Sequence, residues 1–207
     1  MGASIKTQLP FLLPYSIFLL VGFYFSFMLS QSDISIQVNS IHNEILDSLN
    51  AFGTYLGDGF WVVFLGFCLF FYDKKLGLTI ILAYAISSGL VQLLKHSVFS
   101  DYHRPMYYLS QIQGIHTVAG VEMNYHNSFP SGHTTAAFSL YSVLAFYFPK
   151  SYIKFTFLLL AIFVAFTRIY LLQHFLIDTL VGSLFGFTFG ALFYYLIFDK
   201  NLILKKK

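Results

Sequence analysis

Long apolar runs dominate this sequence and limit the folds that it can adopt. Hydrophobic residues make up 57% of the 207 positions and charged residues 10%, whereas soluble domains carry about 25% charged residues. A helix needs about 20 consecutive apolar residues to cross a bilayer. Six runs approach this length, at residues 11–30, 60–72, 76–94, 134–148, 155–172 and 175–198. We therefore predict an all-α fold, a polytopic membrane helical bundle with six transmembrane helices and short extracytoplasmic helices and loops.

The rest of the composition narrows the class of protein. The net charge of +3 is small and no basic stripe with interleaved aromatic residues is present, so we predict no nucleic-acid partner. Cys68 is the only cysteine, which excludes an internal disulfide or a cysteine-based metal cage. The first run is longer than the roughly 7–15 residues of a signal-peptide core, so we interpret it as a retained span. With no internal repeat or linker, residues 1–207 are predicted to form a single membrane-embedded domain, with no obligatory protein partner evident.

Two segments allow more than one interpretation. Residues 31–50 carry apolar side chains at helical spacing, namely Ile34, Val38, Ile41 and Ile45. This pattern fits either an amphipathic helix on the membrane surface or a plain connecting helix. The second predicted span is short, because residues 60–72 alone do not reach about 20 positions. Extending it back to residue 52 brings Asp58 and three glycines into the span.

Basic residues are distributed unevenly between the two ends of the predicted spans. Cytoplasmic loops of membrane proteins are enriched in Lys and Arg, so we place both termini in the cytoplasm. Nine of the ten lysines then fall on the cytoplasmic side: Lys6, Lys74, Lys75, Lys150, Lys154, Lys200, Lys205, Lys206 and Lys207. Lys95, Arg104 and Arg168 fall on the outer side, together with all seven histidines. We interpret these three outer cations as members of a binding site.

A polar loop meets an apolar run at Pro130-Ser131-Gly132-His133. A helix that begins here leaves backbone N–H groups unpaired at its N-terminus, which suits an anion. Gly132 lets the backbone approach a ligand closely, and His133 adds a group that titrates near neutral pH. We predict that this step meets residues 95–104 and 168–178 on one membrane face and binds a phosphate group.

The third charged segment holds Arg168, His174 and Asp178. Ionisable residues within a span are costly and are candidates for function. His174 and Asp178 are four residues apart, so on one continuous helix Asp178 accepts a hydrogen bond from the His174 ring. That bond would fix the tautomer and leave the other ring nitrogen as nucleophile or base. The alternative is an interfacial histidine satisfied by a neighbour, with Asp178 stabilising the start of the last helix.

Lys95 and Arg104 flank a polar, aromatic loop. Taken alone, Lys95 is explained by a side chain that reaches toward the headgroups, and Arg104 by a headgroup anchor. Together with Arg168, they supply a point charge and forked donors suited to phosphate oxygens. The outer histidines also permit a zinc interpretation. Three nearby cations would repel a metal ion, so we predict neither a metal nor a cofactor.

These three segments resemble the signature of the type 2 phosphatidic acid phosphatase superfamily, which includes membrane lipid phosphatases and soluble vanadium haloperoxidases. The matching residues are Lys95…Arg104-Pro105, Pro130-Ser131-Gly132-His133 and Arg168-x5-His174-x3-Asp178, a motif core over 95–178. Thr167 stands where the family often has Ser. Eight residues separate Lys95 from Arg104, two more than the family usually has. Lys95 is matched because no other lysine lies nearby.

The resemblance implies a role for each matched residue. His174 attacks phosphorus and forms a phosphohistidine, Asp178 orients its ring, and His133 protonates the leaving group and then activates water. The phosphoryl oxygens bind to Lys95, Arg104, Arg168, Ser131 and the Gly132 backbone N–H. Positioning and charge stabilisation are what phosphoryl transfer chiefly needs, and no cofactor is implied.

The resemblance also implies a function and a location. The expected protein is an integral membrane lipid phosphatase with its site on the extracytoplasmic face. Its small size and single domain favour a bacterial inner membrane over the alternative, a eukaryotic endomembrane. Candidate substrates are isoprenyl diphosphates, phosphatidylglycerol phosphate, phosphatidate and lipid A phosphates. A lipid phosphotransferase would use the same residues. A non-catalytic phosphate-binding transporter or sensor is the alternative from another class, although its charges would line the midplane instead of one end of the spans.

Overall fold

The computed structural model describes residues 5–201, which fold into helices joined by turns and loops, with no strand in that range. The prediction of an all-α fold is confirmed. Lys205, Lys206 and Lys207 lie outside the described residues. The helices are α1 (Ile5–Met28), α2 (Gln31–Ser40), α3 (Glu44–Gly53), a 3-10 turn η1 (Thr54–Gly57), α4 (Gly59–Tyr72), α5 (Lys74–Ser97), α6 (Pro105–Leu109), α7 (Gly132–Tyr147), α8 (Ser151–Tyr170), α9 (Leu176–Tyr194) and a π-helical turn η2 (Tyr195–Asp199).

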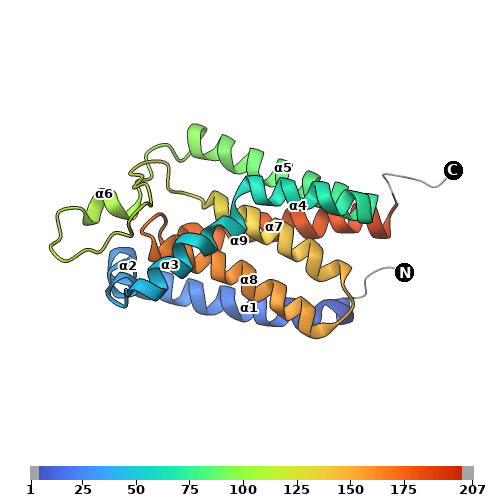
Figure 1. Cartoon of the computed structure of the whole chain (residues 1–207), viewed down its shortest axis with the longest axis horizontal. Helices are drawn as coiled ribbons and strands as arrows, with labels where there is room; N and C mark the ends of the chain where they lie inside the picture. The colour runs from blue at the N-terminus through green and yellow to red at the C-terminus, as the bar shows by residue number, and fades with distance from the viewer. Residues whose placement is uncertain (1–4, 202–207) are drawn as a thin grey trace.

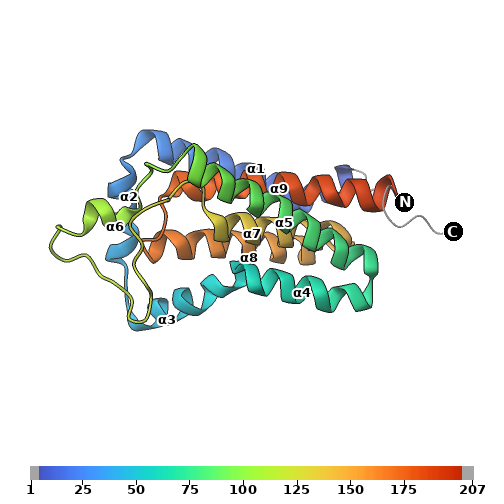
Figure 2. The same ribbon diagram turned by 90° about the horizontal axis from the view of Figure 1, so that it is seen from above.

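The long helices run side by side and give the bundle two distinct ends (Figures 1 and 2). The start of α1, the α4–α5 turn, the α7–α8 turn and the end of α9 lie at one end (Figure 1). The opposite end carries α2, α3, α6 and the long loop that precedes α7 (Figure 2). The end of α5, the start of α7 and the α8–α9 turn therefore point toward the loop-rich end.

Each of the six predicted spans is helical, but the count of six spans is not matched. Four helices are long and apolar enough to cross a membrane: α1, α5, α8 and α9. A fifth span requires α3 with η1 and α4 to be taken together, and this pair is bent by 54°. α7 has 16 residues, or about 24 Å at 1.5 Å per residue, which is shorter than a hydrocarbon core of about 30 Å.

The segment at residues 31–50 forms two helices, so the prediction of a single helix there was wrong. α2 ends at Ser40, and α3 begins after Asn43, whose side chain accepts a hydrogen bond from Leu46 N at 3.0 Å. Asparagine at this position satisfies an orphan N–H group and favours a new helix start. The two helices lie at the loop-rich end of the bundle (Figure 1).

α7 is the central helix, and α9 packs closely against it. Residues 134–145 of α7 are all buried. Three glycines of α9 at four-residue intervals face it: Gly182, Gly186 and Gly190. A Cβ atom on Gly182 would lie 2.6 Å from the Ser131 carbonyl oxygen. Small residues at this spacing let two membrane helices approach closely, and this approach places the start of α7 against the first turn of α9.

One lysine on the predicted cytoplasmic side is buried inside the bundle. Lys154, expected in a cytoplasmic segment between spans, lies in the first turn of α8 and is buried. Its Nζ donates to Gln8 Oε1 at 2.8 Å and to the Ala145 carbonyl at 2.7 Å. A buried cation needs such partners to offset its lost hydration, so this lysine joins α1, α7 and α8.

Candidate active site

His174 lies in the turn between α8 and α9, and Asp178 lies in the first turn of α9. His174 Nδ1 is 3.4 Å from Asp178 Oδ2, and both side chains are about 2% exposed. The contact that we predicted is present, but it does not run along one continuous helix, because α9 begins only at Leu176. The ring nitrogen opposite Nδ1, Nε2, is therefore directed away from the carboxylate.

The end of α8 sets the position of His174. The backbone N–H groups of Gln173 and His174 both donate to the Arg168 carbonyl, at 2.9 and 3.1 Å. Leu172 adopts a φ of 53° to make this turn, a left-handed conformation that is uncommon for a branched residue. Arg168 and His174 therefore belong to one compact turn, with the arginine at its base.

Asp178 accepts three hydrogen bonds in addition to its contact with His174. Its Oδ2 accepts from Ser128 Oγ at 2.5 Å and from the Phe175 N–H at 2.9 Å. Its backbone carbonyl accepts from the Ser131 N–H at 3.0 Å. A buried carboxylate with this many partners keeps one orientation, so the side facing His174 is fixed before any ligand binds.

Ser131, Gly132 and His133 lie at the start of α7, as predicted. Ser131 is the N-cap, and its Oγ accepts from the Thr134 N–H at 3.4 Å. His133 is partly exposed, and its Nε2 lies 3.8 Å from Asp58 Oδ2. The preceding Phe129–Pro130 peptide bond is cis.

The three outer cations converge on this end of the bundle. Lys95 is buried at the end of α5 and donates to the Asn127 carbonyl at 3.0 Å. Arg104 donates to the His126 carbonyl at 2.9 Å and to Gln173 Oε1 at 3.0 Å. Lys95, which is separated from Arg104 by the longer spacing, therefore reaches the same cluster.

Arg168 is buried and only partly satisfied. Its Nη1 donates to Thr54 Oγ1 at 2.5 Å. Its Nε has no hydrogen-bond partner within the part of the chain that the structure describes. Because an unpaired buried donor costs about 1–3 kcal/mol, this atom is suited to an incoming acceptor.

Burial and positive charge act together on His174. Burial, followed by the charges of Arg104, Lys95 and Arg168, holds the pKa of His174 well below its usual value of 6.5. The imidazole is therefore neutral at neutral pH, the form that carries a nucleophilic lone pair. Burial also lowers the pKa of Arg104, while the charge of Asp178 opposes this shift.

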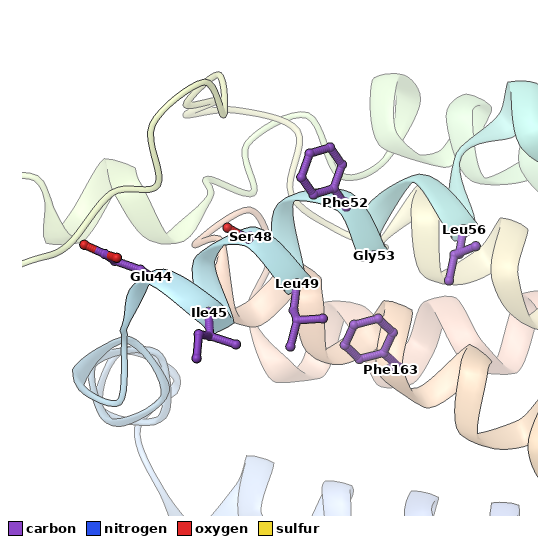
Figure 3. Close-up of a pocket in the computed structure, with 8 residues that line it drawn as sticks. All are labelled: Glu44, Ile45, Ser48, Leu49, Phe52, Gly53, Leu56 and Phe163. Carbon is purple, nitrogen blue, oxygen red and sulfur yellow. The ribbon is translucent and has the colours of Figure 1, made fainter.

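Two hollows lie near this end of the bundle. A cavity of about 460 Å³ extends from Gln31 and Tyr102 to Asp178. A larger groove of about 740 Å³ lies between α3 and Phe163 of α8, and it is lined mainly by apolar side chains (Figure 3). Glu44 is the only charged residue among its described lining residues, so this groove is not suited to a phosphate. The smaller cavity adjoins the charged cluster.

Sequence reasoning missed several residues that the fold brings to the cluster. Ser128 lies two residues before Pro130 and Gln173 lies next to His174, but neither belongs to a predicted motif. Thr54 and Asp58 come from the break between α3 and α4, far from the motifs in sequence. The signal for Asp58 was its position inside an apolar segment, where an acidic residue is costly.

Two of the remaining outer histidines, His42 and His116, contact each other. The rings of His42 and His116 stack with centroids 3.9 Å apart, and His116 Nε2 lies 2.7 Å from Asp47 Oδ2. Within residues 5–201, no group of three or more His, Cys, Asp or Glu side chains is placed to hold a metal ion.

Residues 76–202 match the family model described as the PAP2 superfamily, which is more than half of the chain. The chain belongs to the PAP2 superfamily. This assignment confirms the resemblance seen in the motifs. With its apolar helices, the chain is an integral membrane protein of this phosphatase family.

Two solved structures are similar in fold. The crystal structure of Aquifex aeolicus LpxE shares 29% sequence identity and a TM-score of 0.67, over 78% of this chain and 92% of that chain. The transmembrane PAP2 type phosphatidylglycerolphosphate phosphatase from Bacillus subtilis shares 23% identity and a TM-score of 0.63, over 94% of this chain and 98% of that one. No curated protein matches the sequence significantly.

Proposed function

We propose that this PAP2 protein is a lipid phosphatase that hydrolyses a phosphomonoester or diphosphate of a lipid through a phosphohistidine intermediate. One observation carries the proposal: a neutral His174, oriented by Asp178, lies among Lys95, Arg104 and Arg168. A partly buried group of three cations beside one engaged carboxylate is stabilised by an anion. A phosphate group provides that charge, and its oxygens are acceptors for Arg168 Nε.

In the first step, the Nε2 lone pair of His174 attacks phosphorus while the bond from phosphorus to the lipid oxygen breaks. His133 gives a proton to that leaving oxygen, so the lipid departs as an alcohol or a monophosphate. Asp178 stabilises the positive charge that the substituted ring acquires. The three cations and the N-terminus of α7 stabilise the phosphoryl oxygens in the transition state.

In the second step, water attacks phosphorus and its proton passes to His133. The bond between phosphorus and Nε2 breaks, and inorganic phosphate leaves with His174 neutral again. Both steps use the same two histidines, and His133 ends the cycle protonated as it began. No step in this sequence requires a metal ion, which is part of the proposal.

The charged cluster lies at one end of the bundle, where a headgroup reaches it from the membrane interface. The turns that hold Lys74 and Lys150 lie at the opposite end (Figure 1). We place that opposite end in the cytoplasm by the positive-inside rule, and the site on the extracytoplasmic face of a bacterial inner membrane. The substrate class stays as predicted: isoprenyl diphosphates, phosphatidylglycerol phosphate, phosphatidate or lipid A phosphates.

The test measures phosphate release from a panel of these lipids by purified wild type and by His174→Ala, with EDTA present. We expect release by the wild type that survives EDTA and at least a 10³-fold loss in the variant, since a nucleophile is removed. Equal release by both proteins, or loss of wild-type activity in EDTA, would contradict the metal-free phosphohistidine mechanism. The best substrate in the panel would identify the lipid.

A further inference from the structure

The break between η1 and α4 carries an acidic residue that the mechanism does not yet use. Asp58 lies at the point where the bent pair of helices changes direction by 54°. It is flanked by Gly57 and Gly59. This is the acidic residue that made the second predicted span ambiguous in the sequence.

Gly57 is packed too closely to accept a side chain, and Gly59 lies against the end of a neighbouring side chain. A Cβ atom on Gly57 would lie 2.7 Å from the His133 carbonyl oxygen and would also collide with Val164 of α8. A Cβ atom on Gly59 would collide with the hydroxyl of Tyr84 on α5. The close approach of the His133 backbone at Gly57 requires glycine. The break is therefore fixed against the turn of α7 that bears His133, and Asp58 has little freedom to move away.

The two carboxylate oxygens of Asp58 face different partners. Oδ1 accepts from the Phe60 N–H at 2.7 Å and so caps the N-terminus of α4. Oδ2 lies 3.8 Å from His133 Nε2. The cap fixes the rotation of the carboxylate, which leaves its second oxygen directed at the imidazole. The two side chains are 39% and 34% exposed, so a substrate can reach this pair.

Burial and then the cations around His133 act against its protonation. Three cations place positive charge near it, namely Lys95 from α5, Arg104 from the loop before α6 and Arg168 from α8. The His174 ring also lies near His133. The carboxylate of Asp178 is engaged by Ser128, Phe175 and His174. Asp58 is the acidic side chain that faces the His133 ring. An opposite charge within about 4–6 Å favours the charged form of an imidazole.

We propose that Asp58 is a positioning residue for His133, which orients the ring and favours the protonated form that donates a proton to the leaving lipid oxygen. This inference rests on the function proposed above, in which His133 is the general acid. Asp58 does not touch phosphorus or the transferred proton in this role. The negative charge of Asp58 offsets the three cations near His133, where the leaving group is protonated. The negative charge of Asp178 offsets them near His174, the nucleophile.

The test uses Asp58→Asn, because asparagine retains the cap on α4 but loses the charge. We expect kcat/KM for the lipid phosphate to fall about tenfold, a fraction of the 10²–10⁴-fold that general acid catalysis contributes. The alkaline limb of the pH profile should move toward lower pH, because the protonated form of His133 is then less favoured. With 4-nitrophenyl phosphate, whose leaving group departs without a proton, the loss should be less than about threefold.

Asp73→Asn is the matched control. Asp73 caps α5 as Asp58 caps α4, with Oδ1 accepting from the Lys75 N–H at 2.8 Å, and it lies at the opposite end of the bundle. This variant should keep the wild-type pH profile and the wild-type ratio of lipid to aryl phosphate activity. His133→Ala and the double variant Asp58→Asn/His133→Ala should be equally slow, because Asp58 acts only through His133.

Several outcomes would overturn the inference. One is an Asp58→Asn variant with an unchanged alkaline limb, and another is an equal loss on both substrates. A double variant slower than His133→Ala by the full factor of Asp58→Asn would also exclude the role. These results differ from failure of the proposed function, in which His133→Ala keeps full activity or the wild type releases no phosphate from any lipid.

Discussion

At the scale of single residues, the site is defined by how His174 and Asp178 are held. Three donors or charged contacts converge on the Asp178 carboxylate, from Ser128, the Phe175 N–H and His174. Since hydrogen bonds to a charged group contribute about 1.5–3 kcal/mol each, the carboxylate is fixed without a substrate. A preorganised carboxylate stabilises the charge that forms on the ring without reorganising during the reaction.

The depressed pKa of His174 gives a prediction for stability against pH. Burial and the neighbouring cations keep the folded protein from binding this proton near the usual pKa of 6.5, while the unfolded chain binds it there. Stability contributed by this group is therefore full above about pH 6.5 and falls as the pH drops below it. We expect the melting temperature of the wild type to decrease more between pH 7 and pH 5 than that of His174→Gln, which cannot titrate.

Thermal unfolding in detergent at several pH values measures this difference. His96→Gln is the control, because His96 is exposed near the end of α5 and its removal should leave the pH dependence as in the wild type. If the wild type and His174→Gln lose the same number of degrees between pH 7 and pH 5, the buried neutral imidazole is contradicted.

Site residues could be predicted from the sequence where they belong to a motif or to a pair at a local spacing. His174 and Asp178 were found by their four-residue spacing, although a helix start separates them. Ser128 and Asp58 were not found, because their roles come from contacts across 50 and 75 positions of sequence. Only the packing of the α3–α4 break against α7 brings Asp58 to His133, and no local pattern encodes that packing.

At the scale of elements, the apolar runs predicted where helices occur but not how the helices break. α3 begins because Asn43 caps it, and α4 begins because Asp58 caps it. Asn43 and Asp58 were both visible in the sequence as possible caps. Each lies inside an amphipathic or apolar pattern, and that pattern favoured one continuous helix over a break. The shortness of α7 was visible in the run at residues 134–148, which has fewer than about 20 positions. The sequence did not show that α7 is enclosed by the other helices.

The seam between α7 and α9 yields a prediction of its own. A Cβ atom on Gly186 would lie 2.8 Å from Phe138 Cβ and would collide with the Thr135 carbonyl. Backbone cannot yield as a flexible side chain does, so the two helices must separate. We expect Gly186→Ala to lower stability by about 1–3 kcal/mol and the melting temperature by several degrees, measured by thermal unfolding.

Phosphate release should fall as well, because the Ser131–Asp178 backbone hydrogen bond lies on the same seam. Gly89→Ala is the matched control, since nothing lies within 4 Å of a Cβ atom there and alanine is favoured in a helix interior. That variant should melt at or above the wild-type temperature. A Gly186→Ala protein that melts with the wild type would show that the seam tolerates a methyl group.

At the scale of the whole molecule, the two ends of the bundle differ in charge and in loop length. One end carries short turns and exposed lysines such as Lys74, and the other carries the long loop and the charged cluster (Figures 1 and 2). The positive-inside rule acts on short loops, so the short lysine-bearing turns predict that their end of the bundle faces the cytoplasm. The cluster cations are exempt from this rule because the fold buries them or pairs them with backbone carbonyls.

This orientation predicts which positions react with a reagent that cannot cross the membrane. In a Cys68→Ala background, Tyr107→Cys on α6 and Lys74→Cys at the start of α5 place single thiols on exposed positions at opposite ends. In intact cells whose outer membrane is permeable to a charged maleimide, Tyr107→Cys should be labelled and Lys74→Cys protected. After lysis both should react, which shows that each thiol is accessible. The reverse pattern in intact cells would place the charged cluster in the cytoplasm, so a lipid phosphate of the inner leaflet would then be the substrate.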